Sequence, residues 1–296
     1  MRFGVLGTGF WAKEVHAAAL AAHPAAELLG IWGRDLAKAK AVGAEFDVPG
    51  YADVDALLAD VDAVAIALPP DVQAPLAVRA AEAGRHLLLE KPIALDLAAA
   101  DRLVAATRSA GVASVVFFTV RFRPATSTWL AQAARTRPAG GDATWIGSLT
   151  GSPFAASPWR QQHGALWDIG PHCLSVLIPA LGPVVGVQAA AGVRDTAHLL
   201  LRHESGVAST VTVSHTVAPL AAGIDVYVHG DAGRLVLIPE EGPAVAPFAV
   251  AVDELTAAAV TGGAHPCDVA FGRDVVAVIE AAERALRSGC REDVVR

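Results

Sequence analysis

Cysteine is scarce in this sequence. Three cysteines, Cys173, Cys267 and Cys290, are spread over the second half of the 296 residues. They share no metal-ligand spacing, and so small and odd a set excludes a framework of disulfides. Isolated thiols are typical of a reducing compartment. We therefore expect a cytoplasmic protein, and no metal site.

An excess of positive charge is missing as well. The chain has 23 Lys and Arg against 30 Asp and Glu, which gives a formal net charge of −7. Nucleic acids and anionic membranes bind basic faces, so we expect neither as a partner. The composition is 53% hydrophobic and 18% charged, which excludes a disordered chain, and 296 residues are enough for two domains.

Long uninterrupted apolar runs are also lacking. The first residues, MRFGVLGTGFW, contain no long apolar segment and no small-residue cleavage site, so we expect no signal peptide. Residues 173–193 carry no charge and are long enough to span a membrane. Two prolines and three glycines interrupt this stretch, which favours a buried helix, a turn and a strand.

The chain up to residue 120 alternates short apolar runs with alanine-rich amphipathic segments. This alternation predicts a parallel sheet covered by helices on both faces. We expect strands near residues 2–6, 27–32, 63–68, 86–89 and 114–119. We expect helices near residues 11–22, 36–44, 54–59, 75–83 and 97–110, two of which end at the glycines Gly84 and Gly111.

The pattern changes after residue 120. A helix over 125–135 and a loop over 136–143 are followed by β-rich runs, and HESG and GDAG between these runs predict hairpin turns. Helices are expected around 172–181 and 268–288. The fold class is therefore α/β, with a doubly wound Rossmann domain over 1–120 and an α+β domain with a large, mostly antiparallel open sheet over 121–296.

A glycine-rich turn follows the first expected strand and opens the first helix. Its pattern is Gly7-x-Gly9-x-x-Ala12. Such a turn brings backbone N–H groups and a helix N-terminus to a pyrophosphate, although a plain tight turn is the alternative. The order of strand, turn and helix favours a dinucleotide site formed by Gly7, Thr8, Gly9, Phe10 and Trp11.

The second expected strand ends in Gly33 and Arg34 instead of an acidic residue. An Asp or Glu at this corner would bind the ribose 2′-hydroxyl of NAD. Glycine leaves room, and Arg34 with Lys38 one helical turn later suits a 2′-phosphate. The pattern favours NADP over NAD; alternatively, Asp35 only caps the next helix and Arg34 is solvated.

Lys91 follows the apolar run HLLL and Glu90, so it is expected at the carboxyl end of the sheet, where doubly wound folds bind ligands. There a lysine can stabilise a developing alkoxide, although a surface turn is the simpler interpretation. The sequence leaves open whether the Lys91–Pro92 bond is cis.

Asp168 and His172 form a second group, in GALWDIGPH. Histidine can exchange a proton near neutral pH, and a nearby carboxylate can orient it. The alternative is a hydrogen-bonded structural histidine. No third ligand lies nearby, so a metal site is the poorer interpretation.

Together these segments resemble the Gfo/Idh/MocA family of glucose–fructose oxidoreductases and inositol dehydrogenases. The similar pieces run through the whole chain: GTGFWA, the segment from VDAVAIALPP to LLLEKPIAL, VRFRPA, GALWDIGPH, GDAGRLVL and ERALRSG. The resemblance implies NAD(P)-linked oxidation or reduction of a sugar, polyol or similar small molecule. It also implies homodimers or homotetramers, expected to form through the C-terminal sheet.

The resemblance also implies roles for individual residues. Lys91 matches the catalytic lysine after Glu90, and Asp168 and His172 match the substrate-binding aspartate and the acid–base histidine. Further matching positions would contact the cofactor, at Leu68, Pro69, Glu90 and Arg160, or the substrate, at Arg121 and Trp159. The family also includes relatives that cleave glycosides with NAD and non-enzymatic NAD(P)-sensing regulators, so these activities remain alternatives.

Three features depart from the family pattern. Gln73 replaces a histidine, and Ser175 stands where many members have an aspartate, which puts sugar-type hydroxyl contacts in doubt. The segment before GALWD is short and aromatic, with Phe154, Trp159 and Trp167. These aromatic residues suggest a smaller or less polar substrate.

Overall fold

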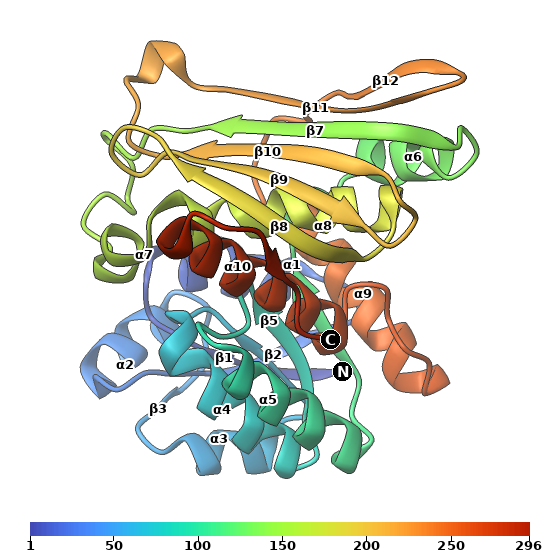
Figure 1. The fold of residues 1–296 in the computed structure, drawn as a ribbon. Helices are drawn as coiled ribbons and strands as arrows, with labels where there is room; N and C mark the ends of the chain where they lie inside the picture. Colours follow the sequence, from blue (N-terminus) through green and yellow to red (C-terminus); the bar gives the residue numbers. More distant parts are fainter. The chain divides into compact units, whose positions relative to one another are not determined.

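The computed structural model describes residues 1–296 and divides into two compact units (Figure 1). The first unit contains Met1–Phe122 and Gly242–Arg273, and the second contains Arg123–Glu241 and Asp274–Arg296. The domain boundary at residue 120 stays a prediction. The compact units add that Gly242–Arg273 pack with the amino-terminal part of the chain.

The first unit is built on a six-stranded parallel sheet. Its strands are β1 (Arg2–Leu6), β2 (Glu27–Trp32), β3 (Gly50–Tyr51), β4 (Ala63–Ile66), β5 (His86–Glu90) and β6 (Ser114–Phe117), in the order β3-β2-β1-β4-β5-β6. The strand order reverses between β1 and β4, and the glycine-rich turn follows β1 at this point. This sheet confirms the expected Rossmann topology, and only the two-residue β3 was not predicted.

Helical segments join the strands of this sheet, and one more follows its last strand. They are η1 (Ala12–Ala17, a π-helix), α1 (Ala18–Ala22), α2 (Leu36–Ala44), α3 (Val54–Asp60), α4 (Pro70–Glu82), α5 (Leu97–Ala110) and η2 (Thr119–Phe122). Asp35, Asp53 and Asp96 accept backbone hydrogen bonds as N-caps of α2, α3 and α5. Helix α4 begins five residues before its predicted start, because Pro70 fits the first helical position.

Helix α9 (Val245–Thr261) was not predicted from the sequence. It packs on η1, α1, β5 and β6 within the first unit. Phe248 is fully buried, with its ring 4.2 Å from His16 and 5.0 Å from Phe117 between centroids. A parallel sheet needs apolar cover on both faces, and α9 supplies it for β5 and β6.

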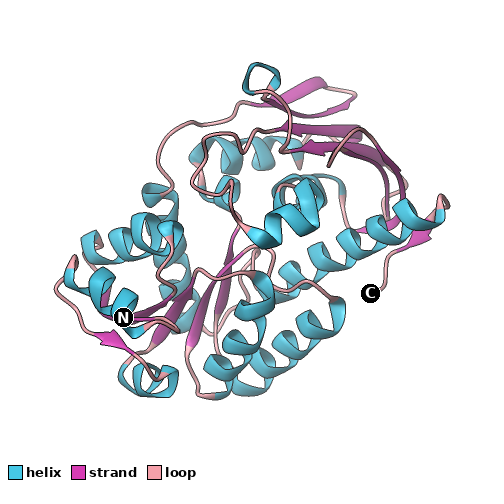
Figure 2. Cartoon of the chain, turned by 90° about the vertical axis from the view of Figure 1, so that its left-hand side faces the viewer, coloured by secondary structure: helices cyan, strands magenta, loops and turns pink.

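The second unit contains a seven-stranded sheet, seen from the side in Figure 2. Its strands are β7 (Pro138–Ile146), β8 (Val184–Ala191), β9 (Ala197–His203), β10 (Ala208–Ser214), β11 (Gly223–Gly230), β12 (Gly233–Leu237) and β13 (Glu292–Asp293), in the order β12-β11-β7-β10-β9-β8-β13. Only the β7–β10 pair is parallel. The sheet confirms the mostly antiparallel prediction, and both expected hairpin turns are present.

The loop expected over residues 136–143 is wrong, because β7 begins at Pro138. The PAGG sequence suggested a turn, but this segment pairs with β10 on one side and β11 on the other. A Cβ on Gly140 would lie 2.4 Å from the imidazole of His229. Glycine therefore permits a close approach inside the sheet, and tertiary pairing outweighs its turn preference.

The helices of the second unit are α6 (Pro124–Ala133), α7 (Pro158–Asp168), α8 (Gly170–Leu181) and the short η3 (Pro219–Ala221), while α10 (Val269–Ser288) begins in the first unit and continues here. Helix α7 was not predicted. The segment Pro158–Leu181 is long and apolar enough to cross a membrane, but 78% of its most apolar window is buried inside the protein. It is a core segment. Residues 173–193 form the end of α8, a turn and β8, as their interrupted pattern indicated.

Candidate functional site

The turn after β1 has the geometry of a dinucleotide loop. Gly7 has φ +141°, and a Cβ there would lie 2.6 Å from the carbonyl oxygen of Ala67. A Cβ on Gly9 would meet no atom within 4 Å, so the backbone is open where a pyrophosphate would approach. Phe10, beside it, is 51% exposed. These residues fit a dinucleotide.

The end of β2 forms the neighbouring corner. A Cβ on Gly33 would lie 2.6 Å from the methyl of Thr8, so the glycine lets the turn after β1 pack closely. Asp35 accepts hydrogen bonds from the N–H groups of Ala37 and Lys38, at 3.0 and 3.2 Å. Asp35 is therefore the helix cap, and Arg34 and Lys38 are exposed at the corner.

The end of β5 is joined to the glycine turn through Glu90. The Trp11 indole N–H donates to Glu90 Oε1 at 2.6 Å, and His16 Nε2 lies 2.9 Å from the same oxygen. His16 is fully buried. The structure thus brings two predicted residues together, and adds His16, which the sequence analysis missed because it lies four residues after the motif that ends at Ala12.

Gln73, on α4, holds the backbone around Lys91. Its side-chain amide accepts from the N–H of Glu90 at 2.9 Å and donates to the carbonyl oxygens of Glu90 and Pro92 at 2.7 and 3.2 Å. The Lys91–Pro92 bond is cis, and the Lys91 side chain is half-buried. Leu68 and Pro69, also half-buried, precede α4 at the end of β4.

The second unit holds a buried charged cluster around Asp168, the last residue of α7. Arg160 Nε donates to Asp168 Oδ2 at 3.0 Å. The guanidinium carbon of Arg160 lies 4.4 Å from the ring centre of Phe154 and 4.6 Å from that of Trp159. His215 Nδ1 lies 3.7 Å from the same Asp168 oxygen. Arg160 thus contacts Asp168, and its expected cofactor contact stays a prediction.

Asp195, in the β8–β9 loop, completes this cluster. Its Oδ2 lies 2.9 Å from His215 Nε2 and accepts from the N–H groups of Ala165 and His215 at 3.2 and 3.0 Å. Burial acts to raise the pKa of Asp195, but hydrogen bonds from Thr216, Ser214 and the His215 backbone, together with the His215 charge, outweigh it and lower the pKa. Asp195 is therefore an anion.

His172 lies near the start of α8, one turn after Asp168. Its ring is stacked on Trp145 of β7, with centroids 5.3 Å apart and planes 26° apart. Ser175 donates to the His172 carbonyl oxygen at 2.7 Å. Trp167, by contrast, is 1% exposed and its indole donates to Glu283 at 2.8 Å. Trp167 is therefore a core residue, and its ring does not face a ligand site before Asp168.

Arg121, in η2, places its guanidinium carbon 5.8 Å from the ring centre of Phe271. The predicted substrate residues therefore divide between the units: Lys91 and Arg121 belong to the first, and Trp159, Asp168 and His172 to the second. Among the residues that sequence reasoning missed, only Trp145 had a local signal, as an aromatic in the TWIGSL run.

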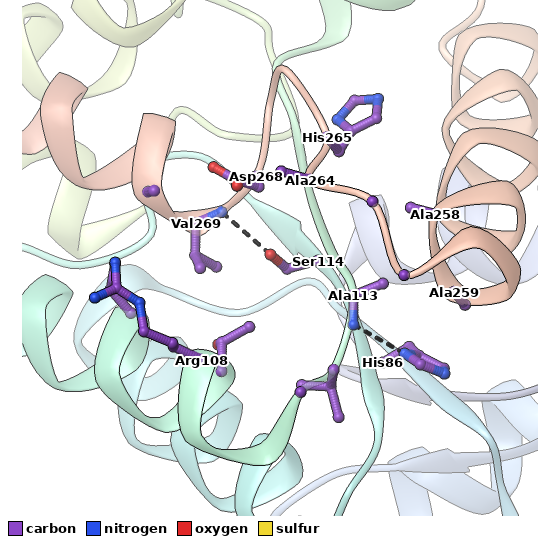
Figure 3. Close-up of a pocket in the computed structure, with 17 residues that line it drawn as sticks. His86, Arg108, Ala113, Ser114, Ala258, Ala259, Ala264, His265, Asp268 and Val269 are labelled. Carbon is purple, nitrogen blue, oxygen red and sulfur yellow. Dashed lines mark hydrogen bonds between the residues drawn. The ribbon is translucent and has the colours of Figure 1, made fainter.

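A pocket of about 400 Å³ in the first unit lies at the amino ends of strands β5 and β6, opposite the carboxyl ends that carry Lys91 (Figure 3). It includes His86 and Ser114, which begin β5 and β6, whereas Lys91 follows the end of β5. His86 Nδ1 accepts from the Ala113 N–H at 3.0 Å, and burial lowers the pKa of His86. Doubly wound folds bind cofactors at the carboxyl ends of strands, so this pocket is not the dinucleotide site.

Comparison with known protein families identifies both parts of the chain. Residues 1–118 match the family described as "Oxidoreductase family, NAD-binding Rossmann fold". Residues 115–236 match the "GFO/IDH/MocA C-terminal domain". The chain belongs to the Gfo/Idh/MocA family. It is thus a member of a family of NAD(P)-dependent oxidoreductases, as its motifs implied.

Similar proteins agree with this assignment. The dTDP-3,4-didehydro-2,6-dideoxy-alpha-D-glucose 3-reductase of Streptomyces antibioticus is 32% identical over 257 residues, which cover 79% of this chain and 74% of that protein. Uncharacterized oxidoreductase ORF334 of Rhizobium meliloti is 39% identical over 107 residues, and the match spans only 32% of its length. Levoglucosan dehydrogenase, solved with NADH and L-sorbose, has a TM-score of 0.87 at 20% identity, covering 100% of this chain and 99% of that one. It shares the fold.

Proposed function

We propose that this member of the Gfo/Idh/MocA family is a dehydrogenase or reductase. Its reaction would move a hydride between a nicotinamide dinucleotide and a secondary alcohol or ketone of a sugar, polyol or diol-like small molecule. The observation that carries the proposal is the strand end at Glu90 and Lys91. There Trp11 of the glycine turn donates to Glu90, so Lys91 and the proposed dinucleotide loop lie together at the carboxyl ends of the strands.

The cofactor contacts follow from this edge. The backbone of residues 7–11 would hold the pyrophosphate, and Leu68 and Pro69 would lie along the nicotinamide side. Arg34 and Lys38 are exposed at the end of β2, where they would bind a 2′-phosphate, so NADP is proposed over NAD. Arg160 is proposed to reach the cofactor from α7. When bound, the nicotinamide supplies or accepts the hydride.

The chain's own residues handle the proton and the charge. His172 takes the hydroxyl proton in oxidation and returns it in reduction. The Lys91 ammonium donates a hydrogen bond to the same substrate oxygen and stabilises its developing charge. Glu90 ends the strand before Lys91 and sets the position of the lysine. Gln73 holds the backbone of Glu90. Asp168 orients the substrate or His172, and Arg121 and Trp159 contact the substrate.

The test is a panel of sugars, polyols and diols offered with NADP and with NAD, followed at the nicotinamide absorbance. We expect turnover with NADP, and a fall of about 10²- to 10³-fold in Lys91→Met, which keeps the apolar stem but removes the ammonium. Cofactor binding, measured by fluorescence titration, should persist in this variant. Lys40→Met, at an exposed lysine of α2, is the matched control.

Three results would contradict the proposal. Undiminished turnover in Lys91→Met removes the lysine from the mechanism. Release of a free sugar without net absorbance change favours glycoside cleavage. Cofactor binding without any turnover in the panel favours a regulatory protein. A large preference for NAD would overturn only the assignment of Arg34 and Lys38.

A further inference from the structure

His215 is a buried histidine between two carboxylates in the second unit. It follows directly after β10, and its side chain is 4% exposed. Nε2 lies 2.9 Å from Asp195 Oδ2, and Nδ1 lies 3.7 Å from Asp168 Oδ2. Neither His215 nor Asp195 belongs to a motif of the proposed reaction, but His215 lies beside Asp168, which does.

The Asp195 contact determines which ring nitrogen carries a proton. Asp195 already accepts from the side chains of Ser214 and Thr216 and from two backbone N–H groups. An ionised carboxylate only accepts, so the 2.9 Å ion-pair contact favours a proton on His215 Nε2. Asp195 therefore fixes the orientation of the imidazole, and Nδ1 is the atom that faces Asp168.

Asp195 also holds the backbone that leads to Asp168. Its contact to the Ala165 N–H lies just after Gly164, where helix α7 is kinked with φ +66°. Ala165–Asp168 is the last part of α7, so Asp195 ties this part to the β8–β9 loop and to the end of β10. Asp195 therefore contacts both His215 and the backbone three residues before Asp168.

We propose that His215, held by Asp195, is a positioning residue for Asp168. Its Nδ1 lies 3.7 Å from the Asp168 Oδ2 that Arg160 binds, too far for a hydrogen bond, so the imidazole limits the position of this oxygen through close contact and charge. This inference rests on the proposed function, in which Asp168 orients the substrate or His172.

Two substitutions separate the two ring nitrogens. His215→Asn keeps a donor near the position of Nδ1, facing Asp168, and loses the contact to Asp195. His215→Gln keeps a donor near the position of Nε2, facing Asp195, and loses the contact to Asp168. If His215 positions Asp168, kcat should fall about tenfold to a hundredfold in His215→Gln and much less in His215→Asn. A role limited to holding the loop predicts the opposite order.

Crystal structures of both variants provide a readout that needs no substrate. We expect the Asp168 carboxylate to leave its Arg160 geometry in His215→Gln and to keep it in His215→Asn. An unchanged Asp168 in His215→Gln, with kcat unchanged, overturns the inference. If the wild-type protein turns over nothing in the panel, the proposed function fails, and the position of Asp168 in the two structures still decides about His215.

Where these variants do not fold, the wild-type histidine can be observed directly. The ¹⁵N chemical shift of His215 Nδ1 is compared between the unaltered chain and Asp168→Asn, with Asp142→Asn on β7 as the control. A shift change confined to Asp168→Asn supports the inference. An Nδ1 shift that is the same in all three proteins overturns it.

Discussion

At the scale of single residues, Gln73 takes the place of a histidine common in the family, and its contacts explain why it can. It is fully buried, and its amide both donates to and accepts from the backbone around Lys91. An amide can make these bonds without titrating. The departure from the family pattern is therefore compatible with the proposed role of Lys91.

Replacing Gln73 with leucine should destabilise the protein and slow its turnover. The N–H and carbonyl of Glu90 would lose their buried partner, at a cost of about 1 to 3 kcal/mol for each group. The free energy of unfolding in urea measures the loss. Gln161→Leu, at a glutamine whose side chain donates to an exposed carbonyl, is the control, and an equal effect at both positions would contradict the prediction.

At the scale of elements, the β9–β10 hairpin is closed by a buried histidine at the end of β9. His203 is 1% exposed, with Nδ1 2.6 Å from the Gly182 carbonyl oxygen and Nε2 2.8 Å from Ser209 Oγ. Burial lowers the pKa of His203, although the bond to Gly182 acts to raise it. The imidazole is therefore neutral in the folded hairpin, with the Nδ1 proton directed at Gly182.

This lowered pKa predicts how stability depends on pH. The unfolded chain takes up a proton at His203 as pH falls through about 6.5, while the folded chain does so only at lower pH. The unfolded state then binds more protons, so the free energy of unfolding falls as pH drops from about 6.5 toward the lower folded pKa. His203→Gln should reduce this slope in urea titrations between about pH 5 and 8.

The slope should be reduced but not abolished, because burial lowers the pKa of His86 in the same direction. His198→Gln, on the exposed face of the same strand, controls for the loss of one imidazole. An undiminished slope in His203→Gln would contradict the assignment of the neutral ring.

At the scale of the whole molecule, the sheet of the second unit has one exposed face. Strand β9 strictly alternates buried and exposed residues, so one face of the sheet is covered and the other is exposed. Leu200 is 45% exposed on that face. We propose a homodimer or homotetramer formed through it. Cytoplasmic localisation is likewise a proposal, supported by three free cysteines, two of them buried.

Light scattering should give a mass of two or four chains. Leu200→Glu places a charge on the proposed interface and should shift the protein toward the monomer, because an unpaired buried carboxylate is strongly unfavourable. Val260→Glu, at an exposed valine of α9 in the first unit, is the control. A monomeric wild-type protein would refute the proposed interface.

Local sequence determined much of this protein. Strands β1, β2 and β5, helices α2 and α5, and the turn at Gly7 were predicted within a residue or two, because apolar periodicity, Asp caps and glycine geometry act over a few residues. Lys91 at a strand end was likewise evident from the residues around it, whereas Asp168 ends helix α7, which was not predicted. The predicted features need no distant partner.

Only the tertiary structure decided the rest. Helix α9 covers strands more than 120 residues away in sequence, as its contacts to β5 and β6 show. The glycine-rich β7 is a strand because β10 and β11 supply its hydrogen bonds. Glu90 meets His16, and His215 meets both Asp168 and Asp195, only through folding. Such contacts depend on long-range packing, which leaves no local pattern in the residues that make them.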